Sequence, residues 1–469
     1  MLRSRYLILV LVITLILTTC SATIGQDIVP QSPTPTVFLP FVANKYPNPT
    51  IFGVDGNTNL GQVKSANVEI LRLNAQLWWS EVERTKGQYD WQNAERVEAY
   101  LKDAAANGLD VILLVQTSPE WARKYPDSLC GPIKEEEFAS FGNFLYEAVR
   151  RYSQPPFNVK YYQIWNEPDQ PVKTVEQGNN NGCWADPQED YQGNYYGRML
   201  NVVSPRIKSA NPNAQVAIGS LMLICDSREE NPTDYCADEG LRKSANFIEG
   251  ILREAKNSFD LVMFNSGPSY LPGQNPVWTE KNNWRWKVER GGLVDGKINY
   301  LRELMARYGV NKPIIHSEAY YLDRPDDVEN FNQFEEHKAD YLVWVYANGW
   351  SQQLRAVTWY SIEGWKGSEL IRSDGTETKA FQALKTMTGF LKSAELLSRE
   401  DNIGFVKFIL RNGGKTIWLM IPTGQEYGKT YTIGKPSNLE KVVNLFGEEQ
   451  VVSGSTISFT RPAYIFLSP

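Results

Sequence analysis

Eight short apolar segments rich in β-branched residues recur along the chain, and this repetition constrains the fold more than any other feature. Each segment is followed by a stretch with the length and composition of a helix, which is the pattern of βα units around a parallel sheet. Eight such units predict a (β/α)8 barrel. The predicted strands span residues 51–54, 68–73, 110–115, 160–165, 215–219, 261–264, 313–316 and 356–360.

The rest of the sequence supplies a linker, a second domain and the helices. Residues 23–49 are rich in Pro, Ser and Thr and predict an extended linker before a barrel over residues 50–392. Alternating stretches such as FVKFILR and KTIWLMI then predict a small β-sandwich over residues 393–469. We expect it to pack on the barrel, because about 70 residues form a marginal independent domain. Helices are predicted at residues 92–106, 135–152, 191–209, 241–256, 296–308, 331–348 and 379–392.

The amino-terminal residues 1–22 have the layout of a secretory signal. Arg3 and Arg5 precede an apolar run that is too short to span a bilayer comfortably, and small residues follow. Cleavage after Ala22 would release a simple exported protein, which is the reading we favour. The alternative is lipid anchoring at Cys20, because LTTC resembles a bacterial lipoprotein cleavage box. The mature protein is therefore predicted to be secreted or extracellular, with no membrane span.

The cysteine count agrees with export. If Cys20 is removed or acylated, four cysteines remain, and an even count outside the cytosol indicates disulfides. Three pairings of the four are formally allowed. Cys225 and Cys236 close one short polar loop, so we predict that they pair locally and that Cys130 pairs with Cys183.

Charge and histidine content disfavour several functions. A formal net charge of -6 supplies no overall positive field for a phosphate backbone, so nucleic acid is not an expected partner. With only His316 and His337, the chain cannot build a three-histidine zinc site, and a Ser-His-Asp hydrolase is disfavoured. The segment QGNNNGCWADPQED lacks the ligand spacing of a calcium loop and is interpreted as a cleft wall. We therefore predict no metal and no other cofactor.

Two glutamates follow predicted strands at the end of the barrel where active sites lie. Strand 160–165 is followed by Asn166-Glu167-Pro168, and strand 313–316 is followed by Ser317-Glu318-Ala319. Because the carboxyl ends of all barrel strands share one rim, Glu167 and Glu318 can converge across the barrel mouth. Glycoside hydrolysis needs two such groups, one to protonate the leaving oxygen and one to stabilise or attack the anomeric carbon. Asn166 is a candidate to hold the 2-hydroxyl of the sugar.

The motifs QIWNEPD and PIIHSEA resemble those of the clan A glycoside hydrolases, whose catalytic glutamates follow strands four and seven. Within that clan the chain is most similar to family 39, and the resemblance covers about residues 51–391. A trailing β-sandwich also suits that family. The resemblance implies that Glu167 is the acid/base, that Glu318 is the nucleophile, and that the anomeric configuration is retained.

The resemblance also points to supporting residues. Arg72, in ILRLN, resembles the clan's arginine beside the nucleophile, where its charge would keep Glu318 ionised. Trp359, in AVTWYS, resembles the aromatic platform under the sugar ring, with a packed core position as the alternative. Further candidates for stacking on sugar lie just beyond strand ends, namely Trp121, Tyr320 and Trp365.

One departure from the family pattern concerns the segment after the sixth strand. Family members often carry a His followed by an aromatic residue there, whereas this chain reads FNSGPSY from Phe264 to Tyr270. Asn265 stands in the place of that His, and Tyr270 is retained as a candidate substrate contact. The departure bears on sugar specificity more than on catalysis, because both glutamates remain.

Three functions use these features. The first is a retaining hydrolase of oligo- or polysaccharides. The second is a catalytically silent carbohydrate-binding barrel, which is disfavoured because a binding module gains nothing from burying two acids that repel each other. The third is a transglycosylase, which would use the same two glutamates. In each case the expected partner is a carbohydrate.

Overall fold

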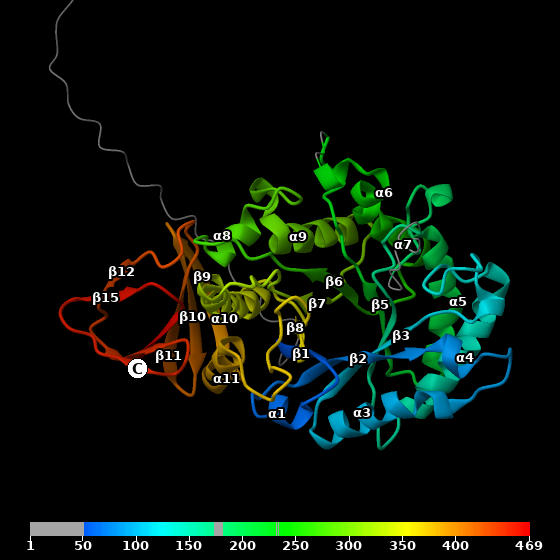
Figure 1. Ribbon diagram of the computed structural model, residues 1–469, viewed down its shortest axis with the longest axis horizontal. Coiled ribbons are helices and arrows are strands. Elements are labelled where there is room, and N and C mark those ends of the chain that lie inside the picture. The colour runs from blue at the N-terminus through cyan, green and yellow to red at the C-terminus, as the bar shows by residue number, and fades with distance from the viewer. Residues whose placement is uncertain (1–50, 173–181, 231, 233) are drawn as a thin grey trace, which may run out of the picture. The chain divides into compact units, whose positions relative to one another are not determined.

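Eight parallel strands form a closed ring in the computed structural model, which describes residues 51–172, 182–230, 232 and 234–469 (Figure 1). The hydrogen-bonded order is β5-β4-β3-β2-β1-β8-β7-β6, and parallel bridges between Ala217 and Leu261 and between Leu221 and Phe264 close the ring. The predicted (β/α)8 barrel is therefore confirmed. Its strands are β1 Phe52–Gly56, β2 Ile70–Trp78, β3 Asp110–Gln116, β4 Tyr161–Asn166, β5 Gln215–Ser220, β6 Val262–Ser266, β7 Ile314–Ala319 and β8 Ala356–Tyr360.

Helices cover the outside of this ring, as Figure 1 shows. Each predicted helix has an observed counterpart, although the predicted 241–256 segment is divided by a 3₁₀ turn at Lys243–Asn246. Side-chain caps fix several starts; Asp327 caps α10 and Thr378 caps α11. The helices are α1 Leu60–Lys64, α2 Trp79–Val82, α3 Glu95–Ala106, α4 Phe138–Tyr152, α5 Asn194–Ala210, α6 Glu239–Arg242, α7 Phe247–Ala255, α8 Pro276–Lys281, α9 Gly292–Arg307, α10 Val328–Ser351 and α11 Lys379–Leu391.

Side chains at alternate strand positions fill the barrel interior in layers, and the candidate site lies in the layers nearest the carboxyl ends of the strands. An apolar layer contains Ile70, Ile112, Tyr161, Met263 and Ala356 among its members. Because successive strand residues point to opposite faces, the inward positions two residues further along lie one level closer to the carboxyl rim. On four of these five strands that level carries a polar side chain, namely Arg72, Gln163, Asn265 and Thr358, whereas β3 keeps the apolar Leu114.

Two antiparallel sheets follow the barrel, which agrees with the predicted C-terminal β-sandwich. One sheet has the order β14-β13-β16-β11-β10-β9 and the other pairs β12 with β15. Arg461 anchors them to α10 through an ion pair with Asp340 at 2.8 Å, and Asn412 donates to the carbonyl of Phe390 in α11 at 2.8 Å. The strands are β9 Glu395–Asn402, β10 Phe405–Asn412, β11 Lys415–Pro422, β12 Tyr431–Gly434, β13 Leu439–Asn444, β14 Glu449–Gln450, β15 Thr456–Phe459 and β16 Ala463–Leu467.

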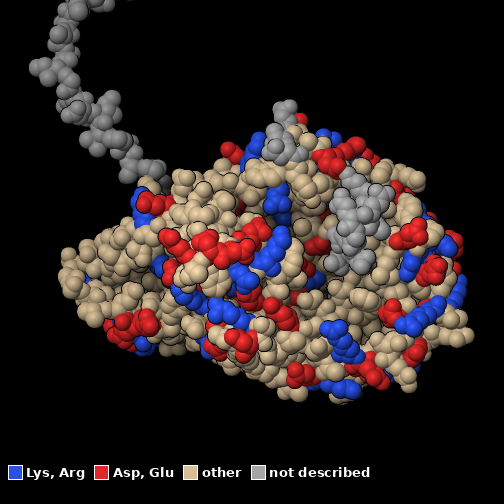
Figure 2. All heavy atoms as spheres, viewed as in Figure 1, with Lys and Arg blue, Asp and Glu red and all other residues tan. Residues whose placement is uncertain are grey.

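The surface mixes charges of both signs. On the face shown in Figure 2, Lys and Arg alternate with Asp and Glu, and no large area of one sign appears. In the part of the chain that the structure describes, no helix is long and apolar enough to cross a membrane. The predicted signal peptide, the alternative lipid anchor at Cys20 and the predicted linker lie outside the described residues.

Two disulfides join the four cysteines in the predicted pairing. Cys130 bonds to Cys183 across 53 residues, linking the loops after β3 and β4, and Cys225 bonds to Cys236 across 11 residues in the loop after β5. All four residues are buried. Both bridges therefore brace loops on the rim that carries the two glutamates.

Removing the longer bridge is expected to destabilise the protein more than removing the shorter one. A cross-link restricts the unfolded chain more strongly when its loop is longer, so the Cys130→Ser/Cys183→Ser variant should lose about 4 kcal/mol of unfolding free energy. The Cys225→Ser/Cys236→Ser variant is the matched control and should lose about 3 kcal/mol. Guanidinium unfolding curves of the two variants measure the difference, and the reverse order would contradict the loop-length explanation.

Candidate active site

Glu167 lies on a sharp turn directly after β4. Its φ is 47° and that of Trp165 is 71°, a left-handed backbone that is uncommon outside glycine and concentrates at functional sites. The turn packs closely on β5, because a Cβ at Gly219 would lie 2.7 Å from the Cδ of Pro168. The Glu167 amide donates to the carbonyl of Ser220 at 2.9 Å. These contacts hold the carboxyl group of Glu167 at the rim of the barrel.

Glu318 lies near the end of β7 and is paired with Arg72 of β2. The distance from Arg72 Nη1 to Glu318 Oε1 is 2.7 Å, and the same nitrogen lies 2.5 Å from Asp55 Oδ2. The other guanidinium nitrogens donate to Gln163 Oε1 and to Asn166 Oδ1, both at 2.8 Å. Arg72 is 3% exposed, so its charge acts in a poorly solvated environment. It thus holds Glu318, Asp55 and Asn166 in one hydrogen-bonded group.

Asn265 connects the two glutamates. Its Nδ2 donates to Glu167 Oε1 at 2.9 Å, and hydrogen bonding from Asn265 also lowers the pKa of Glu318. The hydroxyl of Ser317 donates to Asn265 Oδ1 at 3.0 Å and fixes the orientation of the amide. The carboxyl groups of Glu167 and Glu318 therefore both lie near the Asn265 amide at the carboxyl end of the barrel, and Glu167 is hydrogen-bonded to it.

The two carboxyl groups have different electrostatic surroundings. The pKa of Glu167 is raised to about 8, chiefly by burial and next by the nearby charge of Glu318, while the hydrogen bond from Asn265 opposes the rise. Burial also raises the pKa of Glu318, but Arg72 lowers it through both its charge and its hydrogen bond. Burial also raises the pKa of Asp55, although the charge of Arg72 and its hydrogen bond oppose the rise. A protonated Glu167 and an ionised Glu318 can coexist in this arrangement.

Trp359 does not fit the predicted role of a sugar platform. Its ring has no exposed surface, and its Nε1 donates to the carbonyl of Ser368 at 2.9 Å. The reason is strand alternation, because Ala356 belongs to the barrel interior and Tyr360 therefore points inward while Trp359 points outward. Tyr360 is partly exposed, and burial together with the charge of Glu318 raises its pKa. Tyr360 is the aromatic side chain that β8 presents to the site.

The other predicted aromatic contacts lie at different places. Tyr320 is partly exposed and near the pair, since burial raises its pKa and the charges of Glu167 and Glu318 add to the rise. Trp365 is 53% exposed after β8, and Trp121 packs edge-on against the buried ring of Trp79. Tyr270 is buried, and its hydroxyl donates to Asn330 and Gln333 at 3.2 and 2.8 Å. Among the described residues, the hydrogen bonds and ring contacts of Trp121, Trp365 and Tyr270 involve side chains other than the two glutamates.

Four residues of this site were not expected from the sequence. Asp55 and Gln163 hold Arg72, Tyr360 faces the site, and Lys297 of α9 donates to the carbonyl of Asn265 at 2.9 Å. Asp55 had a usable signal, because it stands at the end of the first predicted strand. Lys297 had none, because a buried lysine in a helix looks like a surface lysine in sequence.

The described residues contain no group of three or more His, Cys, Asp or Glu side chains arranged to hold a metal ion. The polar side chains around Glu318 are instead held by Arg72. Asp169, two residues after Glu167, accepts from the amides of Met222 and Leu223 at 2.9 and 2.7 Å. The chemistry that this arrangement supports directly is proton transfer and nucleophilic attack by carboxylates.

No family model and no curated protein matches the sequence. Solved structures do match the fold. A family 39 glycoside hydrolase from Bacteroides cellulosilyticus WH2 is 16% identical with a TM-score of 0.66, over 90% of this chain and 81% of that one. A family 30 subfamily 8 xylanase from Clostridium acetobutylicum is 13% identical with a TM-score of 0.57, over 91% and 98%. A family 44 xyloglucanase from Paenibacillus polymyxa is 12% identical with a TM-score of 0.55, over 90% and 97%. These likenesses establish the fold and agree with the clan resemblance.

Proposed function

We propose that the protein is a retaining glycoside hydrolase that cleaves O-glycosidic bonds of oligo- or polysaccharides, with Glu318 as nucleophile and Glu167 as acid/base. One observation carries the proposal: Glu167 accepts a hydrogen bond from the neutral amide of Asn265, while Glu318 is ion-paired with Arg72. A pair of carboxyl groups in opposite protonation states is what double displacement requires. The fold shared with glycoside hydrolases supports the same conclusion.

The reaction proceeds in two steps that use the same two side chains. In the first, a Glu318 oxygen bonds to the anomeric carbon, the glycosidic bond breaks, and the proton of Glu167 passes to the leaving oxygen. In the second, Glu167, now ionised, takes a proton from water, whose oxygen bonds to the anomeric carbon and releases Glu318. Arg72 stabilises the Glu318 carboxylate before and after the reaction, and the Nδ2 of Asn166 is available to the 2-hydroxyl because its Oδ1 already accepts from Arg72.

The activity should fall as the pH rises through about 8. Because the pKa of Glu167 is raised to about 8, its carboxyl group is protonated below that pH and ionised above it. The ionised group cannot act as the general acid. On the acid side, activity should fall as Glu318 becomes protonated. Measurement of kcat/KM against pH on a substrate with a poor leaving group shows both limbs. In Glu167→Gln the basic limb near pH 8 should disappear; its persistence would mean that another group titrates there.

Product analysis on a panel of aryl glycosides and polysaccharides tests the proposal directly. Hydrolysis of at least one substrate is the expected result. Products longer than the substrate at high sugar concentration would identify transglycosylation by the same two glutamates. Binding without turnover across the panel would instead favour a silent carbohydrate-binding barrel.

We also propose that the protein acts outside the cytosol. The two disulfides support this location, because such bonds persist in oxidising compartments. The sequence of residues 1–22 supports it independently, with release after Ala22 favoured over a lipid anchor at Cys20. Mass spectrometry of the amino terminus of the exported protein separates the two.

A further inference from the structure

Arg285 lies on the carboxyl rim of the barrel, in the loop between α8 and α9. Three hydrogen bonds fix this loop relative to the glutamates. The Arg285 carbonyl accepts from the amide of Asp226 at 3.1 Å, and Trp286 Nε1 donates to the carbonyl of Leu223 at 2.9 Å. The amide of Leu223 in turn donates to Asp169 at 2.7 Å, two residues after Glu167. The backbone at Arg285 is therefore held on the side of the rim formed by the loops after β4, β5 and β6.

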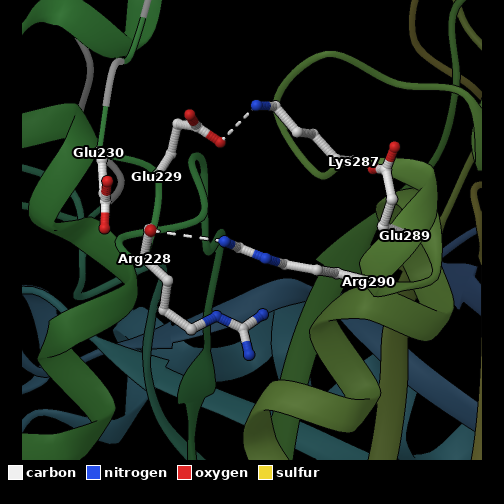
Figure 3. A pocket seen from close by; sticks show the side chains of 6 residues that line it. All are labelled: Arg228, Glu229, Glu230, Lys287, Glu289 and Arg290. Carbon is white, nitrogen blue, oxygen red and sulfur yellow. Dashed lines mark hydrogen bonds and ion pairs between the residues drawn. The ribbon is translucent and has the colours of Figure 1, made fainter. Parts of the chain in front are cut away.

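The guanidinium group of Arg285 has no acidic partner among the described residues. It is half-buried, and its Nε is fully buried without a hydrogen-bond partner. Such a group costs free energy unless something pairs with it. The cations of the adjacent hollow in Figure 3 differ in this respect, since each one is paired. The pairs are Lys287 with Glu229 at 2.8 Å, Arg290 with Asp226 at 2.7 Å, and Arg228 with Asp226 at 2.9 Å and with Glu303 at 3.1 Å.

The charge of Arg285 reaches the residues around the catalytic pair. It opposes the rise in the pKa of Tyr320, two residues after Glu318. Burial lowers the pKa of Lys297 to about 7 and Arg285 contributes to that decrease, while Lys297 itself donates to the carbonyl of Asn265. These effects agree with the position of Arg285 on the carboxyl rim that its backbone hydrogen bonds establish.

Trp284 gives the same place an aromatic surface. Its side chain is 49% exposed, and the guanidinium carbon of Arg285 lies 5.6 Å from its ring centroid. Trp284 and Arg285 line a hollow of about 190 Å³ together with Asp226, Glu229, Lys287 and the Cys225–Cys236 disulfide. Both acids are already paired, Glu229 with Lys287 and Asp226 with Arg228 and Arg290. This volume is below the roughly 300–1,000 Å³ of most ligand pockets, so the hollow suits one residue of a longer chain. An exposed aromatic ring beside an unpaired cation is the chemistry that binds a sugar bearing an anion.

We propose that Trp284 and Arg285 form a subsite for an acidic sugar, in which Arg285 binds the carboxylate of a uronic acid residue and Trp284 covers the apolar face of its ring. The proposal rests on the proposed glycosidase function and narrows the substrate class to uronate-containing glycans. A carboxylate fits the planar fork of a guanidinium with two parallel hydrogen bonds. Since the protein as a whole is negatively charged, such a substrate needs a specific cation to hold it.

Binding to the Glu318→Gln protein tests the subsite apart from turnover. The probes are oligosaccharides from glucuronoxylan, polygalacturonate and alginate, each compared with the same oligosaccharide after chemical reduction of its carboxyl groups. At least one acidic probe should bind more tightly than its reduced form by calorimetry. Adding Arg285→Met should weaken that acidic probe about 10- to 100-fold and leave the reduced form unchanged. Arg285→Lys, which keeps the charge but loses the fork, should fall between the two.

The control is Arg253→Met, which removes the same charge from an exposed position on α7. It should leave all affinities unchanged. Equal binding of every acidic probe and its reduced form, or equal weakening of both forms by Arg285→Met, would overturn the subsite. Hydrolysis of neutral aryl glycosides by the wild-type protein is measured alongside. If neutral aryl glycosides are hydrolysed but acidic probes bind no more tightly than their reduced forms, the proposed function stands and only the subsite is rejected.

Discussion

Glu318→Gln is expected to reduce turnover by about 10⁴-fold or more while sparing the affinity for sugar. Glutamine has nearly the shape of glutamate but cannot attack the anomeric carbon, so the glycosyl-enzyme does not form. Arg72 would then keep its charge with Asp55 as its remaining nearby carboxyl group. Steady-state kinetics measure the loss, and calorimetry with an unreactive oligosaccharide measures the retained binding. Glu329→Gln, an exposed change in the first turn of α10, is the matched control and should keep full activity.

The role of Glu318 also fixes the stereochemistry. Direct attack on the anomeric carbon followed by attack of water gives net retention, and a 2-deoxy-2-fluoro glycoside should leave a sugar covalently bound to Glu318. NMR of the first-formed product from a substrate of known configuration measures the outcome, and peptide mapping locates the label. A product of inverted configuration would contradict both the assignment of Glu318 as nucleophile and the retaining mechanism.

Glu167→Ala should have an effect that depends on the leaving group. Substrates with poor leaving groups need a proton on the departing oxygen, so their kcat/KM should fall by about 10² to 10⁴-fold. Activated aryl glycosides leave without that proton, and their first step should be nearly unaffected. Azide should restore part of the overall rate on the activated substrates, because it attacks the glycosyl-enzyme without a general base.

Parallel kinetics on one activated and one unactivated substrate measure this difference. Glu136→Ala, an exposed carboxylate in the 3₁₀ turn before α4, serves as the control and should change neither rate. Equal losses on both substrates without azide rescue would show that another group supplies the proton.

The strand pattern was readable from the sequence because barrel strands are buried on both faces and stand out as short apolar runs. The sequence alone therefore predicts that Glu167 and Glu318 lie on one rim of the barrel. The local pairing of Cys225 with Cys236 was readable for a similar reason, since only a short loop separates them. Features that depend on chain continuity and strand position were therefore within reach.

The sequence pattern does not show which of Trp359 and Tyr360 points into the barrel. Both stand at the end of β8, and a shift of one residue exchanges the inward and outward faces of a strand. The interior position of Ala356 settles the register, and only packing against the other strands determines it. Tyr270 was misplaced for a related reason, because its hydroxyl is taken up by α10 rather than by the site.

The sequence by itself determined the barrel, the rim and the two glutamates, because these follow from burial pattern and order along the chain. The tertiary structure decided how the two acids differ. The hydrogen bond from Asn265 to Glu167 and the pairing of Arg72 with Glu318 each join segments far apart in sequence. Charge interactions depend on distances of a few ångströms and on the exclusion of water, and neither is set until the chain has folded.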